Sequence, residues 1–233
     1  MPNIFDIKLV FTQIPSLLLY LPVTLEITIL SMVIGLLLGF ILAIIKVKGI
    51  TFLTQLTAVF VSFTRGTPLL VQLYLTYYGI PIFLRYYNYY NDTTYNLNSI
   101  PPLLFVLVTF SLNEAAYNSE SIRAAIQSIE KGQIEAAYSL GMTFFQVLYR
   151  IIIPEAFVVA LPTLGNALIS LLKGTSLAFV CSVVEITAQG KILAGSNYRY
   201  FEVYVSLAII YWVMTIIIER SIKVIERKLT IPE

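Results

Sequence analysis

Long apolar stretches with almost no charge dominate this sequence and decide which solvent it can fold in. The stretch over residues 22–45 contains a single charged residue, Glu26. A helix of about 20 apolar residues crosses the hydrocarbon core of a bilayer. Hydrophobic residues make up 58% of the chain and charged residues 12%, whereas soluble domains average roughly 25% charged residues. The sequence therefore predicts an all-α, polytopic membrane protein.

Five such stretches follow one another along the chain, and we predict five transmembrane helices. They cover about residues 22–45, 51–84, 100–119, 151–172 and 200–218, with a further apolar piece over 175–184. The second stretch is interrupted at Arg65-Gly-Thr-Pro68. Proline removes a backbone donor there and glycine loosens the helix, so we expect a kink or break. No internal repeat is visible, and we predict a single membrane domain over residues 1–233.

The distribution of lysine and arginine orients these spans. With the N-terminus outside, ten basic residues fall on the inner side: Lys46, Lys48, Arg65, Arg123, Lys131, Arg150, Arg220, Lys223, Arg227 and Lys228. Five fall on the outer side: Lys8, Arg85, Lys173, Lys191 and Arg199. Because cytoplasmic loops are enriched in basic residues, we expect the C-terminus and the polar segment 120–150 in the cytoplasm. The N-terminal segment lacks the pattern of a cleaved signal peptide, and we expect it to be retained.

Several function classes are disfavoured by composition. The chain has no histidine, and Cys181 is its only cysteine, which removes the commonest metal ligand and any paired-thiol site. Its net charge of +2 is too small to suggest nucleic acid binding. The run Lys173-Gly-Thr-Ser has its lysine on the wrong side of the glycine for a phosphate-binding loop. We predict no enzyme activity, no metal and no cofactor, so any ATP is bound by another chain.

One polar segment stands between the third and fourth apolar stretches, at about residues 120–150. Ala136 and Ala137 give a helix surface low enough to enter a groove on a partner, and Glu135 offers a charged anchor. Gly141 can take the left-handed conformation that ends a helix. Pro154 is placed near the first turn of the next span, where proline is tolerated. The segment predicts two short helices at a corner on the membrane surface, although an ordinary amphipathic connection is the alternative.

Three motifs carry a resemblance to a known family. The first reads Glu135-Ala-Ala-Tyr-Ser-Leu-Gly141, then nine residues, then Ile151-Ile-Ile-Pro154. The others are Arg65-Gly-Thr-Pro-Leu-Leu-Val-Gln72, with Tyr78-Gly-Ile-Pro81 beyond it, and Leu172-Lys-Gly-Thr-Ser-Leu177. Together they resemble permease subunits of bacterial ATP-binding-cassette (ABC) importers, in the histidine, glutamine and cystine branch for polar amino acids.

The resemblance covers about residues 24–229, with isoleucine at Ile153 where the family usually has leucine. It implies the type I importer permease architecture in a bacterial cell membrane, with a cytoplasmic coupling helix formed around Glu135, Ala136, Ala137, Gly141 and Pro154. The implied partners are two copies of an ABC ATPase subunit, an extracellular substrate-binding protein and a second permease copy, identical or related. L-cystine is the first substrate candidate, because the region 173–212 looks most like cystine permeases.

Polar residues inside or beside the apolar stretches are candidates for a substrate pathway, because such groups usually face a cavity or a partner. The candidates are Thr67, Asn118, Glu120, Thr175 and Ser176. A carboxylate such as Glu120 or Glu114 would meet the substrate ammonium, and backbone amides near Thr67 and Thr175 would meet its carboxylate.

Purely structural roles stay open for these candidates and for other polar residues beside the apolar stretches. Thr175 and Ser176 can satisfy backbone groups, Glu26 can reach the outer headgroups, and Arg65 and Arg123 can pair with acids at the inner surface. The tyrosines between Tyr86 and Tyr95 favour an interfacial aromatic belt.

Two other function classes stay open as well. One is a self-sufficient proton-coupled amino acid carrier, with Glu26, Glu114 and Glu120 as its proton path. Five spans without a repeat are few for such a carrier. The other is a membrane receptor or scaffold that transports nothing.

Overall fold

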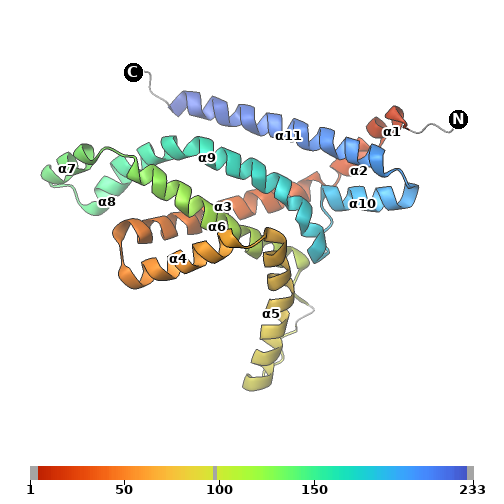
Figure 1. Ribbon diagram of the computed structural model, residues 1–233, viewed down its shortest axis with the longest axis horizontal. Coiled ribbons are helices and arrows are strands. Elements are labelled where there is room, and N and C mark those ends of the chain that lie inside the picture. Colours follow the sequence, from red (N-terminus) through yellow and green to blue (C-terminus); the bar gives the residue numbers. More distant parts are fainter. Residues whose placement is uncertain (1–4, 97–98, 230–233) are drawn as a thin grey trace.

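The computed structural model describes residues 5–96 and 99–229, and all regular structure in these ranges is helical (Figure 1). The helices are α1 (Ile7–Thr12), α2 (Ile14–Leu18), α3 (Leu21–Lys48), α4 (Thr51–Gly66), α5 (Leu69–Asn91), α6 (Pro102–Gln127), α7 (Lys131–Ser139), α8 (Phe144–Val147), the π-helix η2 (Leu148–Ile152), α9 (Ile153–Gly174), the 3-10 helix η3 (Thr175–Cys181), α10 (Ile186–Asn197) and α11 (Tyr200–Leu229). The all-α class is confirmed.

The helices long and apolar enough to cross a membrane are fewer than the five predicted spans. Three qualify within the described residues, namely α3, the continuous segment Phe144–Cys181 and α11. A fourth is added if α4 and α5, which meet at an angle of 111°, count as one bent span. The predicted break at residues 65–68 is therefore confirmed. The stretch over 100–119 became α6, which is long enough but too polar to qualify by composition.

Helix α6 carries polar residues because neighbouring helices cover it. It packs against α3, α4, α5 and α9, and Glu114, Asn118 and Ser119 are all buried. A hydropathy count assumes that a span faces lipid, whereas α6 faces protein on several sides. Its lower hydropathy follows from its central position.

Helices α3 and α6 form the closest pair in the bundle, because two glycines of α3 face α6. A Cβ atom at Gly35 would lie 2.5 Å from the Cβ of Glu114, and one at Gly39 would lie 3.1 Å from the Ala115 carbonyl oxygen. The two glycines are four residues apart, the spacing that lets membrane helices approach backbone to backbone.

The break between α4 and α5 is held by Gln72. Its side-chain amide donates to the carbonyl oxygens of Thr64, at 2.7 Å, and Thr67, at 3.0 Å, and to the Thr67 hydroxyl at 3.0 Å. Its Oε1 accepts from Asn113 Nδ2 of α6 at 3.0 Å. A bend in an apolar region exposes backbone carbonyls that must find donors, and Gln72 supplies them.

The arrangement has two ends (Figure 1). Helices α7 and α8 and the C-terminal end of α11 lie toward one end of the bundle, whereas α1, α2 and α10 lie at the other. Helix α5 projects away from the bundle. The predicted polar segment and the C-terminal end of α11 thus share one side of the molecule.

Candidate functional site

The segment between α6 and α9 folds as the predicted elbow of two short helices, α7 and α8. In α7, Ala137 is 4% exposed and packs into the main hydrophobic core, with Ile134 half-buried beside it. Glu135 and Ala136 are exposed, since neighbouring residues of a helix point about 100° apart. The two alanines therefore have different roles, since Ala137 anchors the helix and Ala136 belongs to its free face.

The free face also carries large apolar side chains. Leu140 is 84% exposed, Phe145 75% and Tyr149 76%. Among them, Phe145 lies near the charged end of α3, with its ring centroid 5.9 Å from the ammonium of Lys48. Exposed apolar side chains of this size mark a surface that contacts another protein or a membrane.

Gly141 ends α7 in the way the sequence predicts. Its φ angle is +79°, in the left-handed region that glycine adopts without cost. The amide of Met142 donates to the Ala137 carbonyl at 3.1 Å, and that of Gly141 donates to the Tyr138 carbonyl at 2.9 Å. These two bonds form a Schellman motif, in which an apolar residue after the glycine packs back on the helix. Met142 does so, and it packs against the core cluster that contains Ala137.

The second half of the elbow begins with a capping box, formed by Thr143 and Gln146. From Phe144 onward α8, η2, α9 and η3 continue without a break to Cys181. Pro154 lies in the first turn of α9, as predicted, but a helix precedes it. The π-helix η2 accommodates the proline, because Ile153 N–H bonds to Leu148 five residues back and the wider turn relieves the clash that proline makes in an α-helix. The elbow is therefore joined rigidly to α9.

The five predicted pathway residues lie in different places. Thr67 is at the bend between α4 and α5, where its hydroxyl donates to the Phe63 carbonyl at 2.9 Å. Asn118 is 1% exposed and donates to Glu114 at 3.1 Å. Both residues satisfy groups of the protein itself.

Glu120 lies at the same end of the bundle as the elbow. It accepts from Lys46 of α3 at 2.5 Å and pairs with Arg123 at 2.7 Å. The expected acid partner of Arg123 is thus found.

The outcome for Arg65 differs. Its guanidinium lies over the ring of Tyr117, 5.3 Å from the ring centroid, and Arg65 has no acid partner among the described residues. The expectation for Arg65 was wrong because α4 carries it away from the cluster of Lys46, Glu120 and Arg123 toward the middle of α6.

Thr175 and Ser176 donate to the carbonyls of Leu172, at 2.7 Å, and Lys173, at 2.8 Å. These bonds satisfy carbonyls where α9 tightens into the 3-10 helix η3. Thr175 is fully buried, whereas Ser176 lines a cavity that it shares with Lys173 and Tyr211.

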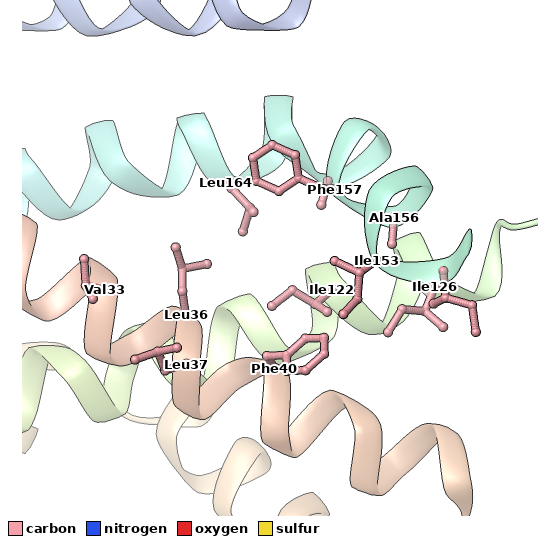
Figure 2. Close-up of a pocket in the computed structure, with 12 residues that line it drawn as sticks. Val33, Leu36, Leu37, Phe40, Ile122, Ile126, Ile153, Ala156, Phe157 and Leu164 are labelled. Atoms are coloured by element: carbon pink, nitrogen blue, oxygen red, sulfur yellow. The ribbon is translucent and has the colours of Figure 1, made fainter. Parts of the chain in front are cut away.

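A separate cavity of about 330 Å³ lies between α3, α6 and α9 (Figure 2). Its wall is apolar and includes Val33, Phe40, Ile122, Ile153 and Leu164. A zwitterion placed there would lose its hydrogen bonds to water without replacement. We therefore exclude this cavity as a site for a polar substrate.

Comparison with known proteins identifies the family. A model of the family described as "Binding-protein-dependent transport system inner membrane component" matches residues 35–231. The chain belongs to this family of transport-system membrane permeases.

Full-length relatives agree with this assignment. The permease is 41% identical to the "Probable amino-acid permease protein YxeN" of Bacillus subtilis over 99% of this chain and 98% of that protein. It is 39% identical to the "L-cystine transport system permease protein TcyL" of the same organism, over 98% and 93%. A solved structure described as "an amino acid ABC transporter with histidines" superposes with a TM-score of 0.79 at 34% identity, covering 96% of this chain and 99% of that one.

Two contacts tie the permease's elbow to the rest of the bundle, and the sequence did not reveal them. The ammonium of Lys48, in the last turn of α3, lies 3.9 Å from the ring centroid of Phe144 in α8. The Lys46–Glu120 pair joins the same end of α3 to α6. The sequence showed only that both lysines follow an apolar stretch. Lysines in that position usually serve to orient a span in the membrane, so they gave no hint of these contacts.

The permease also has a buried carboxylate that the sequence reading passed over. Glu185 is fully buried and caps α10 through a 2.8 Å bond from the Ala188 amide. It also accepts from Thr24 of α3, at 3.5 Å, and from the hydroxyl of Tyr211 in α11, at 3.3 Å. A single acid directly after the apolar piece 175–184 was the available clue.

Proposed function

We propose that this chain is the membrane-spanning permease subunit of an ABC importer for polar amino acids, energised by a separate ATPase subunit. The observation that carries the proposal is the elbow, with Glu135, Ala136 and Leu140 exposed on a helix whose other side is fixed in the core. The family membership and the amino acid transporters among its relatives support it.

The proposed assembly has two ATPase copies under the elbows, a second permease copy beside this one and a binding protein that delivers substrate from outside. Whether the second permease copy is identical or related is left open. In this proposal the N-terminus is outside and the C-terminus is cytoplasmic. The position of the elbow and the end of α11 on one side of the bundle supports this orientation (Figure 1).

In the proposed mechanism, closure of the ATPase pair on ATP draws the two elbows together. Each elbow passes this movement to α9, because α8 and α9 are one continuous helix. It also reaches α3 through Lys48 on Phe144. The spans then open the pathway outward, and hydrolysis returns it to the inward state.

The experiment is ATP-dependent uptake by the assembled importer with Glu135→Lys. We expect uptake to be abolished while the chain still inserts into the membrane. Glu219→Lys is a matched control, since it makes the same charge change at an exposed position of α11. Normal uptake by Glu135→Lys would argue against coupling through the elbow.

A self-sufficient proton-coupled carrier is not favoured by the positions of its three acids. Glu26 is exposed on α3, Glu114 is bonded to Asn118 and Glu120 is paired with two cations. Uptake into vesicles that contain this chain alone, driven by a proton gradient, would support the carrier. Uptake only with an ATPase subunit and ATP would support the importer.

L-cystine is the first substrate candidate, supported by the 39% identity to a permease named for cystine transport. Competition of unlabelled L-cystine, L-glutamine, L-histidine and L-arginine for uptake tests it. Strong competition by L-cystine alone is the expected outcome.

A further inference from the structure

A second cavity, of about 540 Å³, opens between the end of α9, α10 and α11. Its wall differs from that of the apolar cavity, since it includes Lys173, Ser176, Thr187, Tyr211, Trp212 and Thr215. The volume is within the range of small-molecule sites, about 300–1,000 Å³. Along α11 it extends from Tyr204 to Thr215, about 16 Å of helix at 1.5 Å per residue, or half of a hydrocarbon core of about 30 Å.

Lys173 gives this cavity its charge. It is the only charged residue in the cavity wall, and it forms no ion pair within the described part of the chain. An ammonium group offers three donors and no acceptor. The cavity can therefore bind a carboxylate at Lys173.

The hydroxyl groups of the wall supply acceptors. The Tyr211 hydroxyl donates to Glu185, which lies behind the wall, at 3.3 Å. The hydroxyls of Thr187 and Tyr211 are 2.8 Å apart. Because the proton of Tyr211 goes to Glu185, Thr187 must donate to Tyr211, and the lone pairs of Thr187 are left to accept from a ligand. The faces of Tyr204 and Trp212 can also attract a cation.

One polar atom of the wall lacks a partner. The Thr215 hydroxyl is buried and makes no hydrogen bond to other described residues. A buried hydroxyl without a partner costs free energy, and Thr215, halfway along α11, is one of the residues that line the cavity. Its oxygen lies below the surface of the wall, so a rotation of the Thr215 side chain about χ1 would present the hydroxyl to a ligand.

We propose that this cavity binds a free amino acid, with its carboxylate at Lys173, its ammonium at Thr187 and the faces of Tyr204 and Trp212, and its side chain toward Thr215. The inference rests on the proposed function and gives it a substrate site. Of the five pathway residues predicted from the sequence, Ser176 lies in this wall.

The single tryptophan of the chain makes a direct test possible, because Trp212 lies in the cavity wall. The full-length chain in nanodiscs is titrated with L-cystine, L-glutamine, L-histidine and L-arginine while Trp212 emission is recorded. We expect a saturable change with at least one of them. For that amino acid, Lys173→Met should weaken binding about 10- to 100-fold, as expected for lost hydrogen bonds to a charged group, and Lys173→Arg should restore part of it.

Two controls separate recognition from folding. Lys191→Met removes a nearby lysine that stacks on Phe179, outside the cavity wall, and should bind as the wild type does. The second control is an amine that lacks the α-carboxylate, and it should bind weakly to the wild type. Agmatine replaces L-arginine for this purpose, and cystamine replaces L-cystine. Lys173→Met should bind the amine and the amino acid about equally. Thr215→Val, which keeps the side-chain shape, is a second variant and should also weaken binding.

The result that overturns the proposal is an unchanged Trp212 emission with all four amino acids, or wild-type affinity in both Lys173→Met and Thr215→Val. If the assembled importer then still shows ATP-driven uptake, with an unchanged KM in Lys173→Met, the cavity assignment fails and the proposed function stands. If the cavity binds an amino acid but the assembly shows no ATP-driven uptake, the proposed function fails instead.

Discussion

Gly35 of α3 lies directly against Glu114 of α6, so closely that a Cβ atom at Gly35 would be 2.5 Å from the Cβ of Glu114. The contact shows how a carboxylate can lie in the middle of a membrane bundle. The glycine removes the steric barrier between two helices, and the close approach then shields Glu114 and Asn118 from lipid. The stability of this helix pair should therefore depend on the size of residue 35.

Gly35→Leu should destabilise the bundle, because the added side chain has only α6 backbone and Glu114 to enter. Overpacking of a close helix contact costs about 1–3 kcal/mol or more. Thermal unfolding of the purified chain in detergent would show this as a lowered midpoint. Gly79→Ala is the control, since nothing lies within 4 Å of a Cβ there. Equal midpoints for the two variants would contradict the packing described for α3 and α6.

Gly141→Val should uncouple uptake from ATP hydrolysis and leave the spans assembled. A β-branched residue at a φ of +79° costs about 1–2 kcal/mol, so the Schellman turn would open and α7 would lose its fixed position. Uptake and ATPase activity are measured together in the assembled importer. Gly132→Ala, inside α7 with only Glu130 Oε1 near its Cβ position at 3.8 Å, should keep wild-type coupling. Full coupling in Gly141→Val would show that the turn geometry is not required.

Glu120→Gln should loosen the contact between the C-terminal end of α3 and α6. The side chains of Lys46 and Glu120 are 14% and 19% exposed, so this ion pair is neither fully buried nor on the surface. A surface pair contributes about 0–1 kcal/mol, whereas disruption of a buried pair costs about 3–5 kcal/mol. We expect a loss of about 1–3 kcal/mol in unfolding free energy. The double variant with Lys46→Met should cost less than the sum of the single variants. Strict additivity would mean that the pair contributes nothing.

Gln72→Leu should disturb the bend between α4 and α5, because the carbonyls of Thr64 and Thr67 would lose their shared donor. An unsatisfied buried acceptor costs about 1–3 kcal/mol. Spin labels at Phe63 and Phe83, on the two sides of the bend and both exposed, would report a broader distance distribution. Gln72→Glu, which keeps the shape but cannot donate when ionised, should give the same broadening. A distribution as narrow as in the wild type for both variants would exclude this role of Gln72.

Local chemistry made several features predictable from the sequence. Pro68 with Gly66 requires a broken helix wherever the segment lies, and the structure places a 111° bend there. Gly141 followed by Met142 is a local stop signal, and the turn takes the predicted left-handed form. The long stretch before Lys46 predicted a span because hydropathy needs no knowledge of neighbours. These predictions succeeded since each depends on residues that are close in sequence.

Hydropathy alone does not mark α6 as a span, because this helix faces protein and not lipid. Helix α6 can carry Glu114 and Asn118 in its middle because α3 packs over them. The sequence of α6 alone does not show whether a polar residue is covered by a neighbouring helix or lies at the end of a span. Likewise the polar segment 120–150 was predicted to be separate from the fourth span, although Phe144 begins the continuous helical segment that runs to Cys181. The acid partner expected for Arg65 depended on how α4 packs against α3 and α6.

The sequence by itself thus determined the lipid-facing character of the chain, its break at residues 65–68 and its elbow, because hydropathy and backbone preferences act over a few residues. Tertiary structure alone decided that Gln72 meets Asn113, that Glu185 meets Thr24 and Tyr211, and that Lys173 shares a cavity with Trp212. Those contacts join different helices, and the packing of the whole bundle sets the rotation that brings each pair of side chains together.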